Sequence, residues 1–96
     1  MIVHIVMFEF KEENKVANLQ KAKKMLDALV EKIPTLLSME VGLDFMGSER
    51  SCDLVLTTTF DDKEGLSTYA VHPAHVEVVG FIKEVTQLAK VVDYEQ

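Results

Sequence analysis

Apolar residues occupy both the odd and the even positions near the start of the chain, which predicts a strand covered on both faces. The stretch Ile2–Phe10 is rich in β-branched and aromatic residues, as strands commonly are. Its even-numbered residues, His4 among them, share one face, and its odd-numbered residues share the other. Residues 38–45 alternate between apolar and polar side chains, and residues 52–60 and 91–95 are also typical of strands.

Apolar positions at three- and four-residue steps predict a long helix over residues 15–33. Asn14 precedes this stretch as a candidate N-cap, and Pro34 follows it as a stop signal. The apolar face of this helix consists of Leu19, Ala22, Leu26, Leu29, Val30 and Ile33. Charged residues fill much of the remaining surface, so the helix should pack one face on the sheet.

A second helical region follows the strand predicted over residues 52–60. Asp61 and Asp62 can cap a helix over Lys63–Val71. Pro73 has a preset backbone angle and no N–H, so it suits the first position of a further helix, which we expect over residues 73–89.

Most of the side chains suited to acid–base chemistry lie around the break between these two helices. His72 precedes a proline and is therefore biased away from helical angles. His75 falls in the first turn of the second helix, six residues after Tyr69. We expect the bend to bring a phenol and an imidazole toward one pocket.

The predicted order of elements is β-α-β-β-α-β. This order is the ferredoxin-like α+β pattern, in which a four-stranded antiparallel sheet carries its helices on one face. The chain has 96 residues and contains no linker, low-complexity run or repeat, so we expect one domain over residues 1–96.

The sheet face opposite the helices is apolar as well. The odd-numbered residues of the first strand and Val55 are expected to point there. Because soluble monomers avoid a large exposed apolar patch, this pattern predicts a homodimer whose two sheets pack face to face around a barrel-like interior.

The net charge, the cysteine content and the N-terminal residues exclude several classes of partner, cross-link and location. Ten basic and sixteen acidic residues give a net charge of -6, and Arg50 is the only arginine, which argues against nucleic acid. The single cysteine, Cys52, excludes an internal disulfide. The apolar first residues are short and lack a basic leader, so we expect no signal peptide, no membrane segment and a cytoplasmic location.

Tyr69 and His75 are the candidate catalytic residues. A histidine titrating near neutrality suits a general base that removes a proton alpha to a carbonyl, while the tyrosine orients or donates to an oxygen. The alternative is that His75 only fills a helical turn and bonds a backbone carbonyl. His4 and His72 are candidate pocket-lining residues, with a core role and a turn role as their respective alternatives. The three histidines lack zinc-site spacing and a carboxylate partner, so we expect no metal and no cofactor.

Segments 4–11, 41–44, 69–76 and 91–94 resemble the stress-responsive A/B barrel domain family. The most specific part is the His-Pro-x-His element with a tyrosine three residues before it. The resemblance spans nearly the whole chain. It implies a dimeric α+β barrel built from ferredoxin-like subunits.

One plant member of that family, olivetolic acid cyclase, closes a linear polyketide by an intramolecular aldol condensation without a cofactor. Its catalytic tyrosine and histidine match Tyr69 and His75, and a pocket histidine in its first strand matches His4. A further pocket histidine of that enzyme falls on Leu54 here. The resemblance therefore implies a pocket position at Leu54. The departure there leaves the tyrosine–histidine pair intact and does not fix the substrate or the reaction.

Two classes of function follow. In the first, the dimer binds a small molecule and acts as a cofactor-free cyclase or lyase on a carbonyl compound. In the second, it is a non-enzymatic, stress-associated binding or structural protein. A cofactor-independent monooxygenase is a third alternative, less favoured because the chain has no tryptophan and contains the His-Pro-x-His element. An enclosed pocket reached by both Tyr69 and His75 favours the first class.

Overall fold

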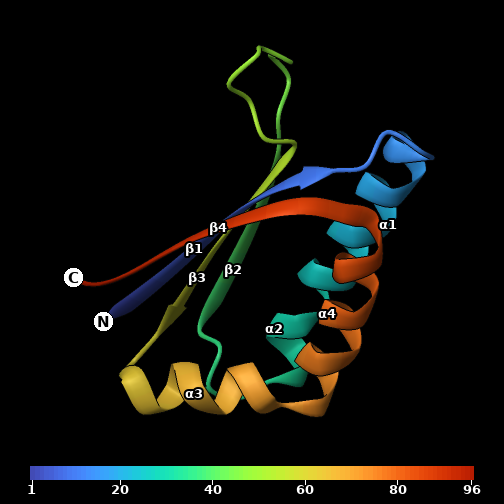
Figure 1. Cartoon of the computed structure of the whole chain (residues 1–96). Helices are drawn as coiled ribbons and strands as arrows, with labels where there is room; N and C mark the ends of the chain where they lie inside the picture. Colours follow the sequence, from blue (N-terminus) through green and yellow to red (C-terminus); the bar gives the residue numbers. More distant parts are fainter.

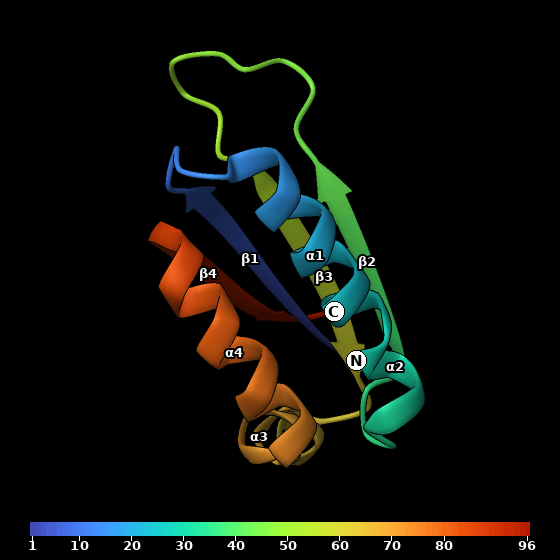
Figure 2. The same ribbon diagram turned by 90° about the vertical axis from the view of Figure 1, so that its right-hand side faces the viewer.

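The computed structural model describes all 96 residues, which form a sheet with helices on one face only (Figure 1). In chain order the elements are β1 (Ile2–Phe10), α1 (Lys15–Asp27), α2 (Leu29–Lys32), β2 (Ser38–Leu43), β3 (Leu54–Phe60), α3 (Lys63–Val71), α4 (Pro73–Val85) and β4 (Thr86–Glu95). The strands pair antiparallel in the order β2-β3-β1-β4. Figure 2 shows α1, α2 and α4 lying across the sheet, with α3 at one end. The predicted ferredoxin-like α+β fold is confirmed.

The core lies between the sheet and the helices. On β1 the even-numbered positions face the helices, and Ile2, Val6 and Phe10 are buried there. The register that pairs Val6 with Leu56 continues this apolar layer onto β3. Leu26 of α1 is 3% exposed and Ile82 of α4 is 5% exposed, so both helices close over the same layer. Burial of these side chains is the main source of stability for helices with little intrinsic propensity.

The break at residue 72 forms as the proline predicts. His72 is extended (φ −63°, ψ 134°), and its Nδ1 accepts a hydrogen bond of 3.1 Å from the Ala74 N–H. Pro73 is the first residue of α4. Asp62 caps α3 in the predicted way, since its Oδ1 accepts from the Gly65 N–H at 2.8 Å.

Several predicted element ends are wrong. The helix expected over residues 73–89 ends at Val85, because Thr86 is already extended and pairs with Phe10. Pairing along the whole of β1 gives residues 86–90 a ladder of hydrogen bonds that a longer helix would forfeit. The first helix is interrupted at Ala28, although that residue keeps helical angles.

The connection between β2 and β3 is longer than the sequence pattern predicts. The two strands stop at Leu43 and Leu54, so the outer residues of the predicted strands belong to a loop. The Phe45 side chain in this loop is 92% exposed. Gly47 takes a positive φ of 62°, and its N–H donates to the Asp44 carboxylate at 2.7 Å, which closes the turn.

The sequence suggested Asn14 as the N-cap of α1, but its side chain makes no capping hydrogen bond. It adopts the left-handed conformation (φ 54°), which asparagine tolerates better than most residues. The chain then turns through a bond from the Lys15 N–H to the Glu12 carbonyl, and the geometry of a side-chain cap is lost.

The far face of the sheet carries no helix, and Figure 1 shows it open. Apolar side chains are nevertheless exposed there, including Met7 at 42%, Val92 at 57% and Tyr94 at 45%. Every residue of β4 after Thr86 is exposed. The predicted second apolar face is therefore present. None of the helices combines the length and the hydropathy that crossing a bilayer requires.

Candidate functional site

The α3–α4 bend brings Tyr69 and His75 into contact. Tyr69 lies in the last turn of α3 and His75 in the first turn of α4. Their ring centroids are 4.2 Å apart, and the ring planes are tilted by 41°. The two residues that the sequence singled out as an acid–base pair are therefore neighbours in space.

Both side chains line a cavity of about 190 Å³ between the sheet and α4. His4 of β1 lines the same cavity, so three of the predicted site residues meet there. The apolar wall includes Val6, Phe8, Leu26, Leu56, Val78 and Ile82. A largely apolar cavity with a few convergent polar groups is the usual form of a small-molecule site.

Tyr69 is buried without a hydrogen bond to its hydroxyl. The residue is 1% exposed, and its ring packs on Phe60 with centroids 5.1 Å apart. The phenol oxygen has no partner within the protein. Burial raises the pKa of Tyr69 to about 12, because the charged phenolate loses its hydration. The group stays protonated at neutral pH, and its hydroxyl is a buried hydrogen-bond donor without an acceptor.

His75 is held in one tautomer. Its Nδ1 lies 3.0 Å from the Ala70 carbonyl oxygen, which can only accept, so Nδ1 carries the proton. In the neutral ring Nε2 then bears the free lone pair. Burial lowers the pKa of His75, the hydrogen bond to Ala70 raises it in part, and repulsion from His4 and His72 adds to the lowering. The neutral, proton-accepting form therefore predominates at pH 7.

His4 forms a hydrogen-bonded pair with Asp93 at the cavity wall. Its Nδ1 contacts a carboxylate oxygen of Asp93, the residue directly opposite on β4. The His4 ring lies 6.3 Å from the Tyr69 ring, centroid to centroid, in an edge-on orientation. The carboxylate fixes which imidazole nitrogen carries a proton, and this leaves the other nitrogen free.

The structure does not bring the other two predicted pocket residues to this cavity. His72 directs its ring to the N-terminus of α4 as a helix cap. Leu54 is a core residue, 2% exposed, opposite Phe8 on the neighbouring strand. Conversely, Asp93 and Lys83 belong to the site and were missed by the sequence reasoning. The strand register that places Asp93 against His4 is the one signal that could have found it.

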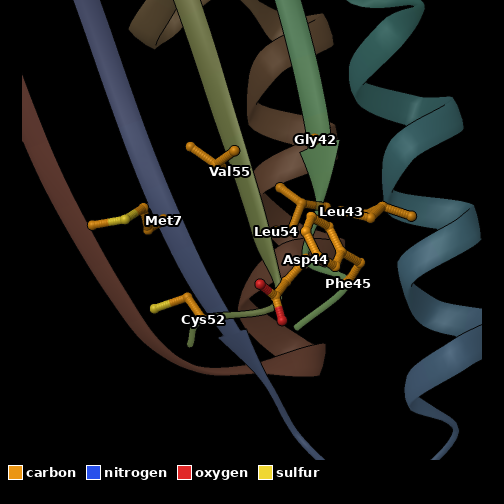
Figure 3. Close-up of a pocket in the computed structure, with 8 residues that line it drawn as sticks. All are labelled: Met7, Gly42, Leu43, Asp44, Phe45, Cys52, Leu54 and Val55. Atoms are coloured by element: carbon orange, nitrogen blue, oxygen red, sulfur yellow. The ribbon is translucent and has the colours of Figure 1, made fainter. Parts of the chain in front are cut away.

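Leu54 lines a different hollow of about 320 Å³ near the loop between β2 and β3 (Figure 3). Met7 and Val55 contribute to it from the open face of the sheet. Figure 3 shows Cys52 and Asp44 as its only ionisable side chains, at separate places on the wall. The hollow is larger than the cavity at Tyr69, but it lacks a paired acid and base.

No group of three or more His, Cys, Asp or Glu side chains is arranged to hold a metal ion. The ionisable side chains that line the cavity are a neutral imidazole (His75), a protonated phenol (Tyr69), the carboxylate-bound imidazole of His4 and the ammonium group of Lys83.

An antiparallel sheet with one-sided helices, together with a buried tyrosine against a half-buried histidine, defines a ferredoxin-like α+β protein with a candidate ligand cavity. More narrowly, the chain belongs to the stress responsive A/B barrel domain family, whose model matches residues 2–96. A stress-response A/B barrel domain-containing protein of Arabidopsis thaliana is 35% identical over 81 residues, covering 77% of this chain and 67% of the plant protein.

Solved structures share the fold of this chain. A protein of unknown function from Bacteroides fragilis, described as dimeric and ferredoxin-like, is 30% identical with a TM-score of 0.91, over 99% of this chain and 95% of that one. A hydroxynitrile lyase from Passiflora edulis superposes with a TM-score of 0.86 at 14% identity, over 97% of this chain and 90% of the lyase. An antibiotic biosynthesis monooxygenase gives a TM-score of 0.81 at 16% identity, over 100% and 98% of the two chains. At such low identity the last two share the fold alone.

Proposed function

We propose that the protein binds a compact carbonyl compound between its sheet and α4 and acts on it by cofactor-free acid–base catalysis. One observation carries this proposal: Tyr69, whose buried hydroxyl has no partner, and His75, whose Nε2 is left to accept a proton, line the same cavity. A buried hydroxyl without a partner costs about 1–3 kcal/mol, and a ligand oxygen would recover that free energy.

His75 is the general base in this proposal. Its Nε2 takes a proton from the carbon alpha to the ligand carbonyl, and the electron pair moves onto the carbonyl oxygen. Tyr69 donates a hydrogen bond to that developing oxyanion. The enolate carbon then attacks a second carbonyl, as in a cyclase, and the protonated His75 returns its proton to the new alkoxide. A lyase runs the same sequence in reverse. Such acid–base help is typically worth about 10²–10⁴-fold in rate.

The proposed protein is a homodimer, in which a second copy of the chain covers the open sheet face. The open sheet face exposes Met7, Val92 and Tyr94, a similar structure is described as dimeric, and face-to-face packing would cover all three side chains. The homodimer does not depend on the catalytic proposal.

A specific observation favours the non-enzymatic alternative. His75 already bonds the Ala70 carbonyl and packs on the Tyr69 ring, which a purely structural histidine would also do. In that case the protein is a stress-associated binding or structural dimer. The monooxygenase alternative has less support, because the chain contains no tryptophan.

Ligand binding followed by proton exchange tests the proposal. Aromatic and polyketide-like keto acids are screened by thermal shift, since binding to the native state alone raises stability. Ligands that bind are then incubated in D₂O, and loss of the alpha-proton signal is followed by NMR. We expect His75→Ala and Tyr69→Phe to remain folded and to slow the exchange by about a hundredfold or more, the low end of acid–base effects. Lys24→Gln, an exposed change on α1, is the control.

Exchange at the wild-type rate in both site variants would remove the catalytic assignment. A wild type that no compound in the screen stabilises would remove the binding assignment as well.

A further inference from the structure

Lys83 is the only charged residue that lines the cavity, apart from the histidines. It lies on α4, eight residues after His75, which at about 1.5 Å per residue corresponds to about 12 Å along the helix. The acid–base pair thus lies toward one end of α4 and the ammonium group toward the other.

This ammonium group has no anionic partner in the protein. Lys83 takes part in none of the ion pairs of the structure. The residues three and four positions away on either side, Val79, Gly80, Thr86 and Gln87, carry no negative charge. Most lysines of the chain also lack an ion pair, so Lys83 is distinguished by its position: it is an exposed residue that lines an otherwise largely apolar cavity.

The volume of the cavity limits the size of a ligand. An engineered apolar cavity of about 150 Å³ in another protein accommodates benzene. The cavity here is modestly larger, at about 190 Å³, and four of its lining residues are not hydrophobic. One substituted ring fits this volume, whereas a coenzyme A thioester or a long polyketide chain would have to extend outside it.

We propose that the ligand is a one-ring monoanion that presents a carboxylate to Lys83 and a carbonyl oxygen to the Tyr69 hydroxyl. This inference rests on the proposed function and adds the charge and size of the substrate. A carboxylate at the ammonium group forms a charge-assisted hydrogen bond, and the apolar wall between the two ends excludes water from the ring.

A matched pair of probes tests the charge requirement. The compound 4-acetylbenzoate has a carboxylate and a carbonyl at opposite ends of one ring, and 4-acetylbenzamide is its neutral counterpart of the same shape. Calorimetric titration of the wild type should show the acid binding about fivefold to tenfold more tightly than the amide, as expected for one partly exposed ion pair. Raising the salt from about 0.05 M to about 0.5 M should weaken binding of the acid and leave the amide unchanged.

Substitution of the lysine should remove this preference. In Lys83→Gln the acid should bind like the amide and lose its salt dependence, whereas the control Lys24→Gln should behave as the wild type. Equal binding of both probes to the wild type, or an unchanged preference in Lys83→Gln, overturns the inference and leaves the carbonyl site intact. Binding of neither probe, with longer polyketide acids still binding, overturns the size limit. Failure of every compound overturns the proposed function together with the inference.

Discussion

Tyr69 gives up the hydration of its hydroxyl and gains no hydrogen bond from the protein in return. Removing that oxygen alone should therefore relieve a penalty and break no contact. We expect Tyr69→Phe to stabilise the fold by about 1 kcal/mol, the lower end of the penalty for an unsatisfied buried polar group. Denaturant titration of the free protein measures this change.

A Tyr69→Phe protein that is clearly less stable than the wild type would show that the hydroxyl has a partner, and would remove the main support for a ligand-facing phenol.

The protonation of His75 should make the stability of the folded protein depend on pH. Because burial lowers the pKa of His75 in the folded state below the usual value of 6.5, the unfolded chain binds the proton more readily. Stability from this group is fully present above pH 6.5 and is lost as the pH falls through the folded-state pKa. Between about pH 7 and pH 5, where an unperturbed histidine titrates, the wild type should therefore lose more stability than His75→Asn. The asparagine amide can still donate to the Ala70 carbonyl.

The difference between the two denaturation curves at each pH isolates the histidine from the carboxylates, which titrate in both proteins. Parallel pH profiles would mean that His75 is as solvated in the folded state as in the unfolded chain. A rate of alpha-proton exchange that rises with pH and has its midpoint below pH 6.5 would report the same group acting as base.

At the scale of elements, α4 is a helix held by packing more than by propensity. It contains three valines before its last residue and a glycine at position 80, which is exposed and has nothing within 4 Å of an added Cβ. Gly80→Ala should therefore stabilise the protein by about 1 kcal/mol, the difference in helix propensity. For a domain of this size that corresponds to a rise of roughly 4–8 °C in Tm.

Replacing Gly47 by alanine should change the stability in the opposite direction. Gly47 has a φ of 62°, where a Cβ is strained even though no atom crowds the position. We expect Gly47→Ala to lower stability by about 1 kcal/mol. If both variants shifted Tm in the same direction, backbone conformation would not be the cause.

Local signals explain which elements could be predicted from the sequence. Pro73 marked the break between α3 and α4 because a proline restricts both its own backbone and that of the residue before it. The alternation of β1 placed His4 on the helix-facing side. The end of α4 at Val85 could not be read from the sequence, since residues 86–90 suit a helix locally and extend only because β1 offers them a partner.

For the site residues as well, the positions that depend on local signals could be predicted, and those that depend on strand pairing could not. Tyr69 and His75 are close in sequence across a bend, so their proximity follows from local rules. Asp93 lies 89 residues from His4 and reaches it only through the register of the first and last strands. Lys83 lines the cavity together with Thr86 and Ala89 of β4, and the sequence pattern had assigned those two residues to the helix.

At the scale of the whole molecule, the apolar open face remains to be explained. The single chain exposes Met7, Val92 and Tyr94 on a sheet that its own helices cover on the other side only. Val92 is 57% exposed, so an aspartate there is compatible with the folded subunit. Burying that charge between two sheets would cost several kcal/mol for each copy. We therefore expect Val92→Asp to yield folded single chains at micromolar concentration, where light scattering gives the wild type the mass of two.

Val16→Glu is the control for this experiment. Val16 is 75% exposed near the N-terminus of α1, on the helical side, where a negative charge favours the helix. That variant should remain dimeric and lose no stability. A wild type with the mass of one chain, or a Val92→Asp protein with the mass of two, would mean that the open face is not the interface. The exposed valine and methionine side chains of the sheet would then need another partner.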